Sequence, residues 1–339
     1  MGAVFFTRSL TAVYRMPPSE YPDPYLHIRR LNPNRDLNAV ADLVEAACEL
    51  KDDPEGAWIL RQMRAFARRA QSYPDVLTLP GAPEGFVWEE NGKIVGNISL
   101  VRHFQADKRI VLIANVAVAR DFRRRGIASA LTRHALRYID QLPRSEVWLQ
   151  VRSENQAAIQ MYTQLGFEFF SALSQWRYSP FHPFPAAPRA RLPHELQVGA
   201  RKPGDWKLQK QWLALNYPLQ TRWYLNVNLD WFSPWSFFAP SAWKSLPALR
   251  HLSLREGKQL LASLTWQKTR LSSDQLWLAL PAGPEEDMRA DFLLSAVLKE
   301  QDPVRSLLLE YPRGRAQLGI QSAGFTLARN LDWMKLKYS

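Results

Sequence analysis

The 339-residue sequence has a single cysteine, Cys48, and no run of 18 or more apolar residues. One cysteine excludes an internal disulfide framework and leaves no Cys-x-x-Cys or Cys/His spacing for zinc. Without a long apolar run, a transmembrane helix is not expected. The sequence therefore predicts a protein of the reducing cytoplasm, with no membrane span and no metal. Cys48 falls on an apolar helix face, where we expect an inert core residue.

Two common nucleotide-binding signatures are also missing, because neither GxxxxGK[ST] nor GxGxxG occurs. Lys and Arg outnumber Asp and Glu by 44 to 32, which gives a net charge of +12. No run of five basic residues accompanies this excess. We interpret the charge as a solvated surface and consider nucleic-acid binding unlikely; an anionic partner or acidic substrate is the alternative.

The length of the chain and its 46% hydrophobic content predict two folded domains. Prolines at positions 180, 183, 185, 188 and 193 predict a linker, since each proline fixes φ and removes a backbone donor. Residues 1–25 are expected to form a leader or an arm docked on the body. Domains are then expected at 26–179 and 194–339, separated by the linker 180–193.

Hydrophobic periodicity and turn residues outline the elements before the linker. Asn91-Gly92 is the strongest short hairpin signal in the chain. The other expected elements are a strand at 26–30, helices at 35–49 and 55–71, strands at 86–90, 93–102, 109–119 and 146–151, a helix at 155–164, and two short final strands at 167–172 and 175–179.

The loop Arg123-Arg124-Arg125-Gly126 stands between the strand that ends near Ala119 and an apolar-periodic helix. The first amides of a helix have no partner within the helix and present partial positive charge. Gly126 lets the backbone approach a ligand closely, because it has no Cβ. The loop therefore predicts a phosphate cradle for a polyphosphate ligand.

The order of motifs around this loop is more specific than the loop alone. R-x-x-G-x-A at 123–128 is followed by a strand at 146–151, by Asn155 and Tyr162, and by Leu165-Gly166-Phe167. This arrangement, over roughly residues 26–178, resembles the GNAT (Gcn5-related N-acetyltransferase) family. The tract 147–167 is similar to the ribosomal-protein alanine acetyltransferases. The resemblance implies an α/β (α+β) fold, with a mixed, mostly antiparallel sheet flanked by helices.

The resemblance also implies an activity and residue roles. Acetyl-CoA would donate an acetyl group to an amine, of a small molecule or of a protein N-terminus or lysine. Tyr162 would protonate the departing thiolate; its alternative is a core residue. Asn155 would hold the cofactor arm, with a helix N-cap as its alternative. The expected cofactor contacts are Val116, Ala117, Val118, Arg123, Arg124, Arg125, Gly126, Ile127, Ala128 and Asn155, the arginines alternatively forming a solvated basic turn.

Gln150 departs from the pattern of the alanine acetyltransferases, in which a glutamate at the matching place serves as general base. A glutamine cannot accept a proton, so the ribosomal-protein substrate does not carry over. Either the amine loses its proton through a water chain, or another group acts as base. Glu89, Glu90 and His103 are the candidates, with solvated surface as their alternative.

A similar order of strands, helices and turn residues returns after the linker, with weaker sequence signals. A hairpin at 252–258, a strand at 275–280, a helix at 287–300, a strand at 306–311 and a last strand pair ending near 338 are expected. Setting Gly324 against Gly166 puts Arg313 opposite Asn155 and Ile320 opposite Tyr162. Three acids at 285–287 stand where the first copy has arginines, and would repel a diphosphate. We therefore expect a degenerate GNAT-like copy without a cofactor.

Nine of the thirteen tryptophans lie in this second part. We expect them in cores or between the domains, with a wall of the acceptor pocket or a partner surface as the alternative. The leading interpretation of the whole chain is an N-acetyltransferase, and a homodimer is possible. The runner-up is a non-catalytic, acyl-CoA-binding regulatory protein, which Gln150 keeps open.

Overall fold

The computed structural model describes residues 24–48, 54–72, 82–105, 108–143, 145–181, 193–225, 229–236, 248–269, 272–300 and 305–337. The predicted leader, apart from its last two residues, and residues 182–192 of the predicted linker lie outside this part. We call residues 24–181 the first half and residues 193–337 the second half.

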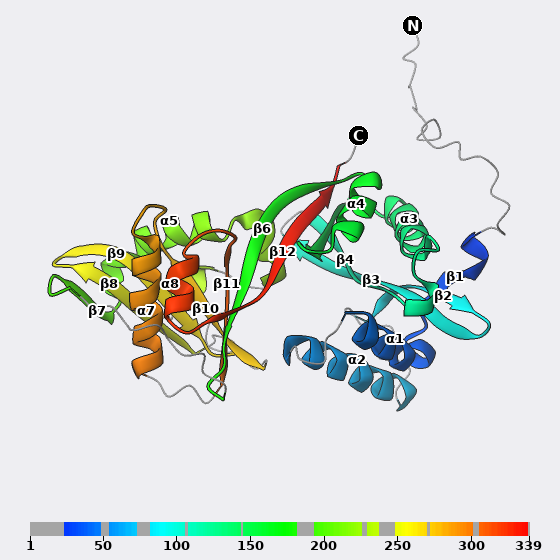
Figure 1. Cartoon of the computed structure of the whole chain (residues 1–339), viewed down its shortest axis with the longest axis horizontal. Helices are drawn as coiled ribbons and strands as arrows, with labels where there is room; N and C mark the ends of the chain where they lie inside the picture. Colours follow the sequence, from blue (N-terminus) through cyan, green and yellow to red (C-terminus); the bar gives the residue numbers. More distant parts are fainter. Residues whose placement is uncertain are drawn as a thin grey trace, which may run out of the picture.

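The first half alternates strands and helices around one sheet (Figure 1). Helices α1 and α2 cover one face, which we call the α1/α2 face, and α3 and α4 cover the other. Asn91 and Gly92 both have positive φ, 51° and 74°, as the predicted two-residue hairpin turn requires. The elements are η2 Pro24–His27, β1 Ile28–Arg30, α1 Pro33–Cys48, α2 Pro54–Ser72, β2 Glu84–Glu90, β3 Lys93–Gln105, β4 Lys108–Val118, η4 Arg120–Phe122, α3 Ile127–Asp140, β5 Ser145–Arg152, α4 Gln156–Gln164 and β6 Phe167–Tyr178.

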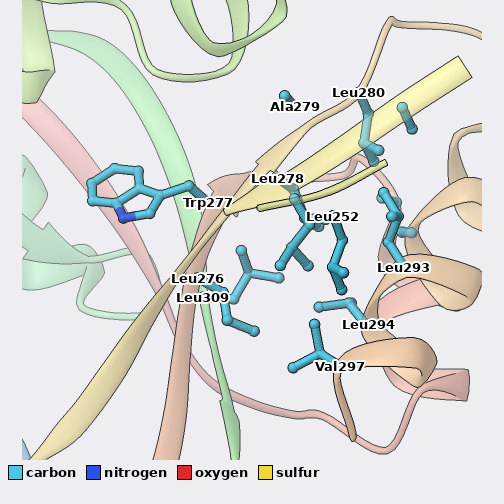
Figure 2. Close-up of a cluster of buried hydrophobic side chains, with 14 of the residues drawn as sticks. Leu252, Leu276, Trp277, Leu278, Ala279, Leu280, Leu293, Leu294, Val297 and Leu309 are labelled. Atoms are coloured by element: carbon cyan, nitrogen blue, oxygen red, sulfur yellow. The ribbon is translucent and has the colours of Figure 1, made fainter. Parts of the chain in front are cut away.

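The second half repeats this plan, with α5, α6 and α8 shorter than α1, α2 and α4 and with α7 similar in length to α3. Its core lies between β10 and α7, where Leu276, Leu278, Leu293 and Leu294 meet, while Trp277 lies on the other side of the strand (Figure 2). The elements are β7 Leu196–Ala200, η5 Pro203–Asp205, α5 Trp206–Asn216, α6 Leu219–Arg222, η6 Trp223–Leu225, η7 Leu229–Phe232, β8 Leu249–Glu256, β9 Gln259–Gln267, β10 Ser273–Ala279, α7 Glu286–Glu300, β11 Ser306–Pro312, α8 Gln317–Ser322 and β12 Thr326–Leu336.

All of these strands join one twelve-stranded sheet in the order β1-β2-β3-β4-β5-β12-β6-β11-β10-β9-β8-β7. Strands β4 and β5 are parallel, as are β10 and β11, and the other neighbours are antiparallel. The predicted α/β fold class, with mixed and mostly antiparallel strands flanked by helices, is confirmed, but the two halves share one sheet instead of each forming its own.

The two halves exchange their last strands. Strand β12 of the second half inserts between β5 and β6, pairing Leu331–Lys335 with Arg152–Trp148 of β5. Strand β6 of the first half in turn pairs with β11 of the second. β6 and β12 also pair with each other along most of their length and cross the middle of the molecule together (Figure 1).

This exchange overturns two expectations. The predicted pair of short strands at 167–172 and 175–179 is one strand, β6, and the predicted last strand pair is the single strand β12. Each half supplies only one strand after its last helix, and that strand is long because it pairs with both halves. A hairpin inside each half is thereby replaced by pairing between the halves.

Aromatic side chains fill the junction on the α1/α2 face. Trp223 of η6 lies 6.2 Å from Trp148 and 5.5 Å from Trp333, measured between ring centroids. All three rings are at least nine-tenths buried and share one cluster with Ile110. For Trp223 and Trp333, the prediction that second-half tryptophans pack between the domains is confirmed.

Candidate functional site

The parallel strands β4 and β5 separate before β4 ends. Their pairing stops at Ile113 and Leu149, whereas β4 runs on to Val118. Asn115 has φ of 49°, and between the pairs Asn97–Ala117 and Ser99–Ala114 one residue of β3 faces two of β4. This bulge bends β4 away from β5. The ends of the two strands therefore diverge, and we call the space between them the cleft.

Backbone groups of β4 line this cleft. Ala119 donates its N–H to the carbonyl of Val95 on β3, at 2.8 Å. Because backbone groups alternate along a strand, those of Val118 and Val116 point away from β3 and toward the cleft. The backbone of Ala117 faces β3, and its buried side chain packs in the cluster beneath α1. Val116 and Val118 are thus placed better than Ala117 for pairing with an extended ligand.

The loop after β4 has the geometry of an anion site. Gly126 caps α3 with φ of 77°, and a Cβ built there would meet nothing within 4 Å. The first intrahelical bond of α3 runs from the amide of Ala130 to the carbonyl of Gly126. The amides of Ile127, Ala128 and Ser129 precede it and have no acceptor within the helix. They point with the positive end of the helix dipole toward the strand ends.

The three arginines of the loop do not act alike. Arg123 folds back, and its Nε donates to the Val118 carbonyl at 3.1 Å. Arg125 lies over the ring of Phe122 and donates to the Asp121 carbonyl at 3.1 Å. Arg124 adopts φ of 66° and is exposed, and the described part of the chain shows no side-chain partner for it. Of the three, Arg124 is the most available to a phosphate.

A cavity of about 380 Å³ adjoins this loop. Its lining combines the C-terminal end of α1 with the end of β4 and the loop that follows it. Val118 and Arg123, both predicted cofactor contacts, are among the lining residues Ala46, Ala47, Val118, Ala119, Arg120 and Arg123. The cleft between the strands and the cradle at α3 are therefore flanked by open space on the α1/α2 face.

Helix α4 brings the two remaining predicted residues to the opposite side of the cleft. Asn155 is its N-cap, and its side-chain oxygen accepts the amide of Ala158 at 3.1 Å. The N-cap interpretation is therefore confirmed, and only the side-chain NH₂ group remains for a cofactor contact. Tyr162 is 6% exposed, with its ring 5.8 Å from that of Phe167. It lies in the cluster between α4 and the sheet.

A small polar group lies on the α1/α2 face beside the bulge. The Nδ2 of Asn97 donates to the Asn115 carbonyl at 2.8 Å and to Ser99 Oγ at 3.2 Å. Ser99 pairs with Ala114, the residue after the last β4–β5 pair, and Gln150 follows Leu149 on β5. Ser99 and Gln150 therefore flank Ala114 on the same face. The Oδ1 of Asn97 and the Nε2 of Gln150 are buried without a partner among the described residues.

The three candidate bases have different surroundings. Glu89 accepts from Arg29 at 2.6 Å and Arg35 at 2.9 Å, and Glu90 lies 4.0 Å from Arg125. His103 packs its ring against Trp223, with the centroids 4.9 Å apart. Burial lowers the pKa of His103, so its imidazole is neutral and able to accept a proton at physiological pH. Of the three, His103 is the one that packs against a junction aromatic ring on the α1/α2 face, whereas the two glutamates lie beside arginines.

The corresponding cleft of the second half is filled by its own side chains. Pairing between β10 and β11 stops at Leu276 and Leu309, so these strands separate too. The hydroxyl of Tyr217 accepts the amide of Leu278 at 3.2 Å. The Nδ2 of Asn216 donates to the carbonyls of Leu278 and Leu280, at 3.3 and 3.1 Å. The backbone groups that would meet a cofactor arm are already bonded.

An ion pair crosses the same cleft from helix to helix. Arg315, before α8, donates to Glu286 at the start of α7 at 2.5 Å and to Asn216 Oδ1 at 2.9 Å. Tyr311 donates to Glu286 at 2.8 Å. The neighbouring acids are also paired, Glu285 with Arg289 and Asp287 with the Gly319 amide. The predicted repulsion of a diphosphate by these acids stays a prediction; the structure adds that Glu285 and Glu286 each pair with an arginine, while Asp287 accepts from an uncharged amide.

The spacing counted from Gly324 misplaced Arg313 opposite Asn155, because the N-cap of α4 is Asn155 and that of α8 is Ala316. The residue after the last parallel pair is Gln150 in the first half and Glu310 in the second. Glu310 is buried, accepts from Tyr224 at 2.5 Å and Gln175 at 3.0 Å, and has its pKa raised by burial. The constant spacing from Gly324 did not account for a shorter connection after β11. The polar group around Asn97 was missed altogether, because its members are far apart in sequence.

Within the part of the chain that the structure describes, no helix combines the length and apolar character needed to cross a membrane. The predicted cytoplasmic location and the possible homodimer stay predictions.

Comparison with known proteins gives the first half a family. Residues 44–167 match the acetyltransferase (GNAT) family model. An uncharacterized N-acetyltransferase of Methanocaldococcus jannaschii is 36% identical over 94 residues, 27% of this chain and 42% of the relative. The [ribosomal protein bS18]-alanine N-acetyltransferase of Escherichia coli is 40% identical over 53 residues, 16% of this chain and 36% of the relative. The chain therefore spans less than half the length of these two relatives.

Solved structures match over nearly the whole chain. A GCN5-related N-acetyltransferase from Sphaerobacter thermophilus aligns with a TM-score of 0.56 and 16% identity, covering 91% of this chain and 94% of that one. The GCN5-related glucosamine N-acetyltransferase region of a fungal multi-domain protein aligns with a TM-score of 0.52 and 13% identity, covering 91% of this chain and 38% of that one. At this identity the likeness shows the fold of both halves and nothing finer.

Proposed function

Because residues 44–167 belong to the GNAT family of acetyltransferases, we propose that this chain moves an acetyl group from acetyl-CoA to an amine. The observation that carries the proposal is the open cleft of the first half. There β4 continues past its last pair with β5 and leads into a glycine-capped helix whose first amides lack acceptors within the helix. An extended thioester with a diphosphate matches both parts of this cleft.

Different residues of the first half have different roles in the proposed acetyl transfer. Val116 and Val118 offer backbone groups to the pantetheine arm, and an amide of this strand end polarises the thioester carbonyl. The amides after Gly126, with Arg124, hold the diphosphate. Tyr162 acts as the acid for the departing thiolate, on the side of the sheet where α4 places it. The nitrogen of the acceptor approaches from the α1/α2 face.

In this proposal the proton of the acceptor amine leaves through ordered water and uncharged side chains. Gln150 cannot serve as base, and Glu89 is held by two arginines. The buried and unpartnered Asn97 Oδ1 and Gln150 Nε2 suit ordered water beside Ser99. His103 is the neutral group on this face to which such water could pass the proton. The acceptor itself, a small molecule or a protein amine, remains to be identified by experiment.

The test is direct. The full chain is incubated with acetyl-CoA and a panel of small amines and peptides, and acetylated product is detected by mass spectrometry while free thiol is counted. We expect product that depends on both substrates, together with saturable acetyl-CoA binding in calorimetry. Binding without product for every amine would support the regulatory alternative. No binding at all would refute the proposal.

A further inference from the structure

The turn between β5 and α4 belongs to the first half but is held by the second. The amide of Ser153 donates to the carbonyl of Asn330 on β12 at 3.0 Å. Its hydroxyl donates to Asp332 Oδ1 at 2.7 Å. Both contacts join residues more than 170 positions apart in sequence. They exist only because β12 crosses into the first half's sheet.

Arg313 completes this group from the loop after β11. One terminal nitrogen of its guanidinium donates to Ser153 Oγ at 2.7 Å and to Asp332 Oδ1 at 2.8 Å. Asp332 is 9% exposed, so the ion pair is shielded from water on one side. Hydrogen bonds with an ionised partner are shorter and stronger than neutral ones. We call Ser153, Arg313 and Asp332 the latch.

The latch acts on residues of the proposed site. Ser153 stands two positions before Asn155, the N-cap of α4, and the Asn155 amide bonds back to the Arg152 carbonyl at 2.9 Å. Tyr162 lies two turns further along the same helix. β12 pairs with β5 from Trp148 to Arg152, on the side opposite the cleft. The second half therefore fixes both the β5 wall and the start of α4.

We propose that Arg313 and Asp332 are positioning residues for the first half's active site, acting through Ser153 on Asn155 and Tyr162. This inference rests on the proposed acetyl transfer. It assigns the second half a role that does not require a cofactor site of its own. Counted from the last parallel pairs, at Leu149 and Leu309, Arg313 lies at the position of Ser153 itself, so the corresponding loops of the two halves contact each other.

The closest matched control is Arg305. It also comes from the second half and pairs with a buried aspartate, Asp274, at 3.3 Å. The side chains are similarly exposed, 40% for Arg305 and 38% for Arg313, but Arg305 bonds to Asp274 and to the Thr269 carbonyl, both in the second half. Arg305→Ala should therefore reproduce the structural cost of removing such an arginine without touching the first half's turn.

The experiment compares Arg313→Ala, Arg313→Lys and Arg305→Ala in the full chain. We expect Arg313→Ala to raise the KM for acetyl-CoA about three- to tenfold and to lower kcat, because small displacements of reacting groups are costly. Arg313→Lys should restore part of both, and Arg305→Ala should leave both near the parent values while shifting Tm similarly. Parent-like KM and kcat in folded Arg313→Ala would overturn the inference.

A second readout separates this inference from the proposed function. Hydrogen exchange of the segment 153–164 should be faster in Arg313→Ala than in Arg305→Ala and the parent, whether or not the chain turns over. Equal exchange in all three would overturn the latch. If the parent neither binds nor consumes acetyl-CoA, the proposed function fails, and exchange alone decides whether the second half positions this turn.

Discussion

In both halves the two parallel strands separate at one end. The space between them is a cleft in the first half and is filled by side chains in the second. In the first half the backbone groups of Val116 and Val118 face the cleft, with the Val118 carbonyl accepting from Arg123. In the second half the backbone of Leu278 is bonded to Asn216 and Tyr217. A helix begins beside each cleft, capped by Gly126 in one case and tied by Glu286 to Arg315 in the other. One scaffold therefore becomes a binding site or a packed core according to a few side chains.

The second half also shows how a fold can keep the strand separation while its own side chains satisfy the backbone there. The β10–β11 separation would leave unpaired backbone groups in the interior, and buried unpaired groups are costly. Asn216, 3% exposed, and Tyr217, 5% exposed, satisfy them from α5. Replacing a ligand by internal side chains keeps the sheet intact.

The largest expected effect concerns Tyr162. Tyr162→Phe should lower kcat about 10²- to 10⁴-fold and leave acetyl-CoA affinity nearly unchanged, since shape is kept and only the proton is lost. Tyr217→Phe in the second half removes a comparable buried hydroxyl and should cost stability with little effect on kcat. Steady-state kinetics with calorimetry checks both. Equal kcat in Tyr162→Phe and the parent would return Tyr162 to the core.

A smaller effect is expected at the cradle. Gly126→Asp places a side chain and a negative charge where the diphosphate is proposed to sit, so acetyl-CoA affinity should fall at least about tenfold. Gly257→Asp is the matched control, because Gly257 also has positive φ, 55°, and open space around it but lies in the β8–β9 turn. Calorimetry measures both. Unchanged affinity in folded Gly126→Asp would remove the cradle from the proposal.

The second cleft should bind nothing even when loosened. Calorimetry should give one acetyl-CoA per chain. Asn216→Ala leaves the carbonyls of Leu278 and Leu280 without their partner and should lower the free energy of unfolding by about 2 kcal/mol. The stoichiometry should stay at one, because Arg315 and Glu286 still cross the cleft. A stoichiometry near two in the parent would show that the second half is functional.

The smallest effect is a pH dependence of stability within the second half. Burial lowers the pKa of His251 to about 3, and Thr265 Oγ1 lies 2.8 Å from its Nδ1. An unfolded histidine titrates near about 6.5, so below that pH the unfolded state binds a proton that the native state does not. The stability contribution is complete above about pH 6.5 and is lost as the pH falls toward 3.

At pH 5.5 this should cost about 1 kcal/mol relative to pH 7.5. Urea unfolding of the parent and of His251→Gln measures it, and His251→Gln should have the flatter pH dependence. His194, which is exposed, provides the control as His194→Gln. Identical slopes in the parent and His251→Gln would mean that another group carries the effect.

Several local structures of this protein can be predicted from short stretches of its sequence. The hairpin at Asn91-Gly92, the loop before Gly126 and the helix capped by Asn155 depend on residues close together in the chain, and the structure shows each of them. Local turn chemistry and periodicity act over a few residues, so they can be read without knowing the rest of the fold.

The features that were missed depend on distant pairing. Nothing in the tract Phe167–Tyr178 reveals that it pairs with β11, or that β12 enters beside β5, because an alternating strand pattern does not name its partner. Pairing between β3, β4 and β5 brings Asn97, Ser99 and Gln150 together. The ion pair of Arg313 with Asp332 likewise joins a loop to a strand that follows it in the chain. The pairing of Glu286 with Arg315 was not predicted either, because the two residues lie far apart in the sequence.

The exchange of β6 and β12 has a consequence for folding. The strand that completes the first half's sheet pairs Leu331 with Arg152, residues separated by most of the second half. Contacts so distant in sequence form slowly, because the loop-closure entropy must be lost before the pairing is gained. The β5 edge of the first half therefore stays open until the second half has been synthesised and folded. An open edge is a template for pairing with other chains, so this protein should be most prone to aggregation during that interval.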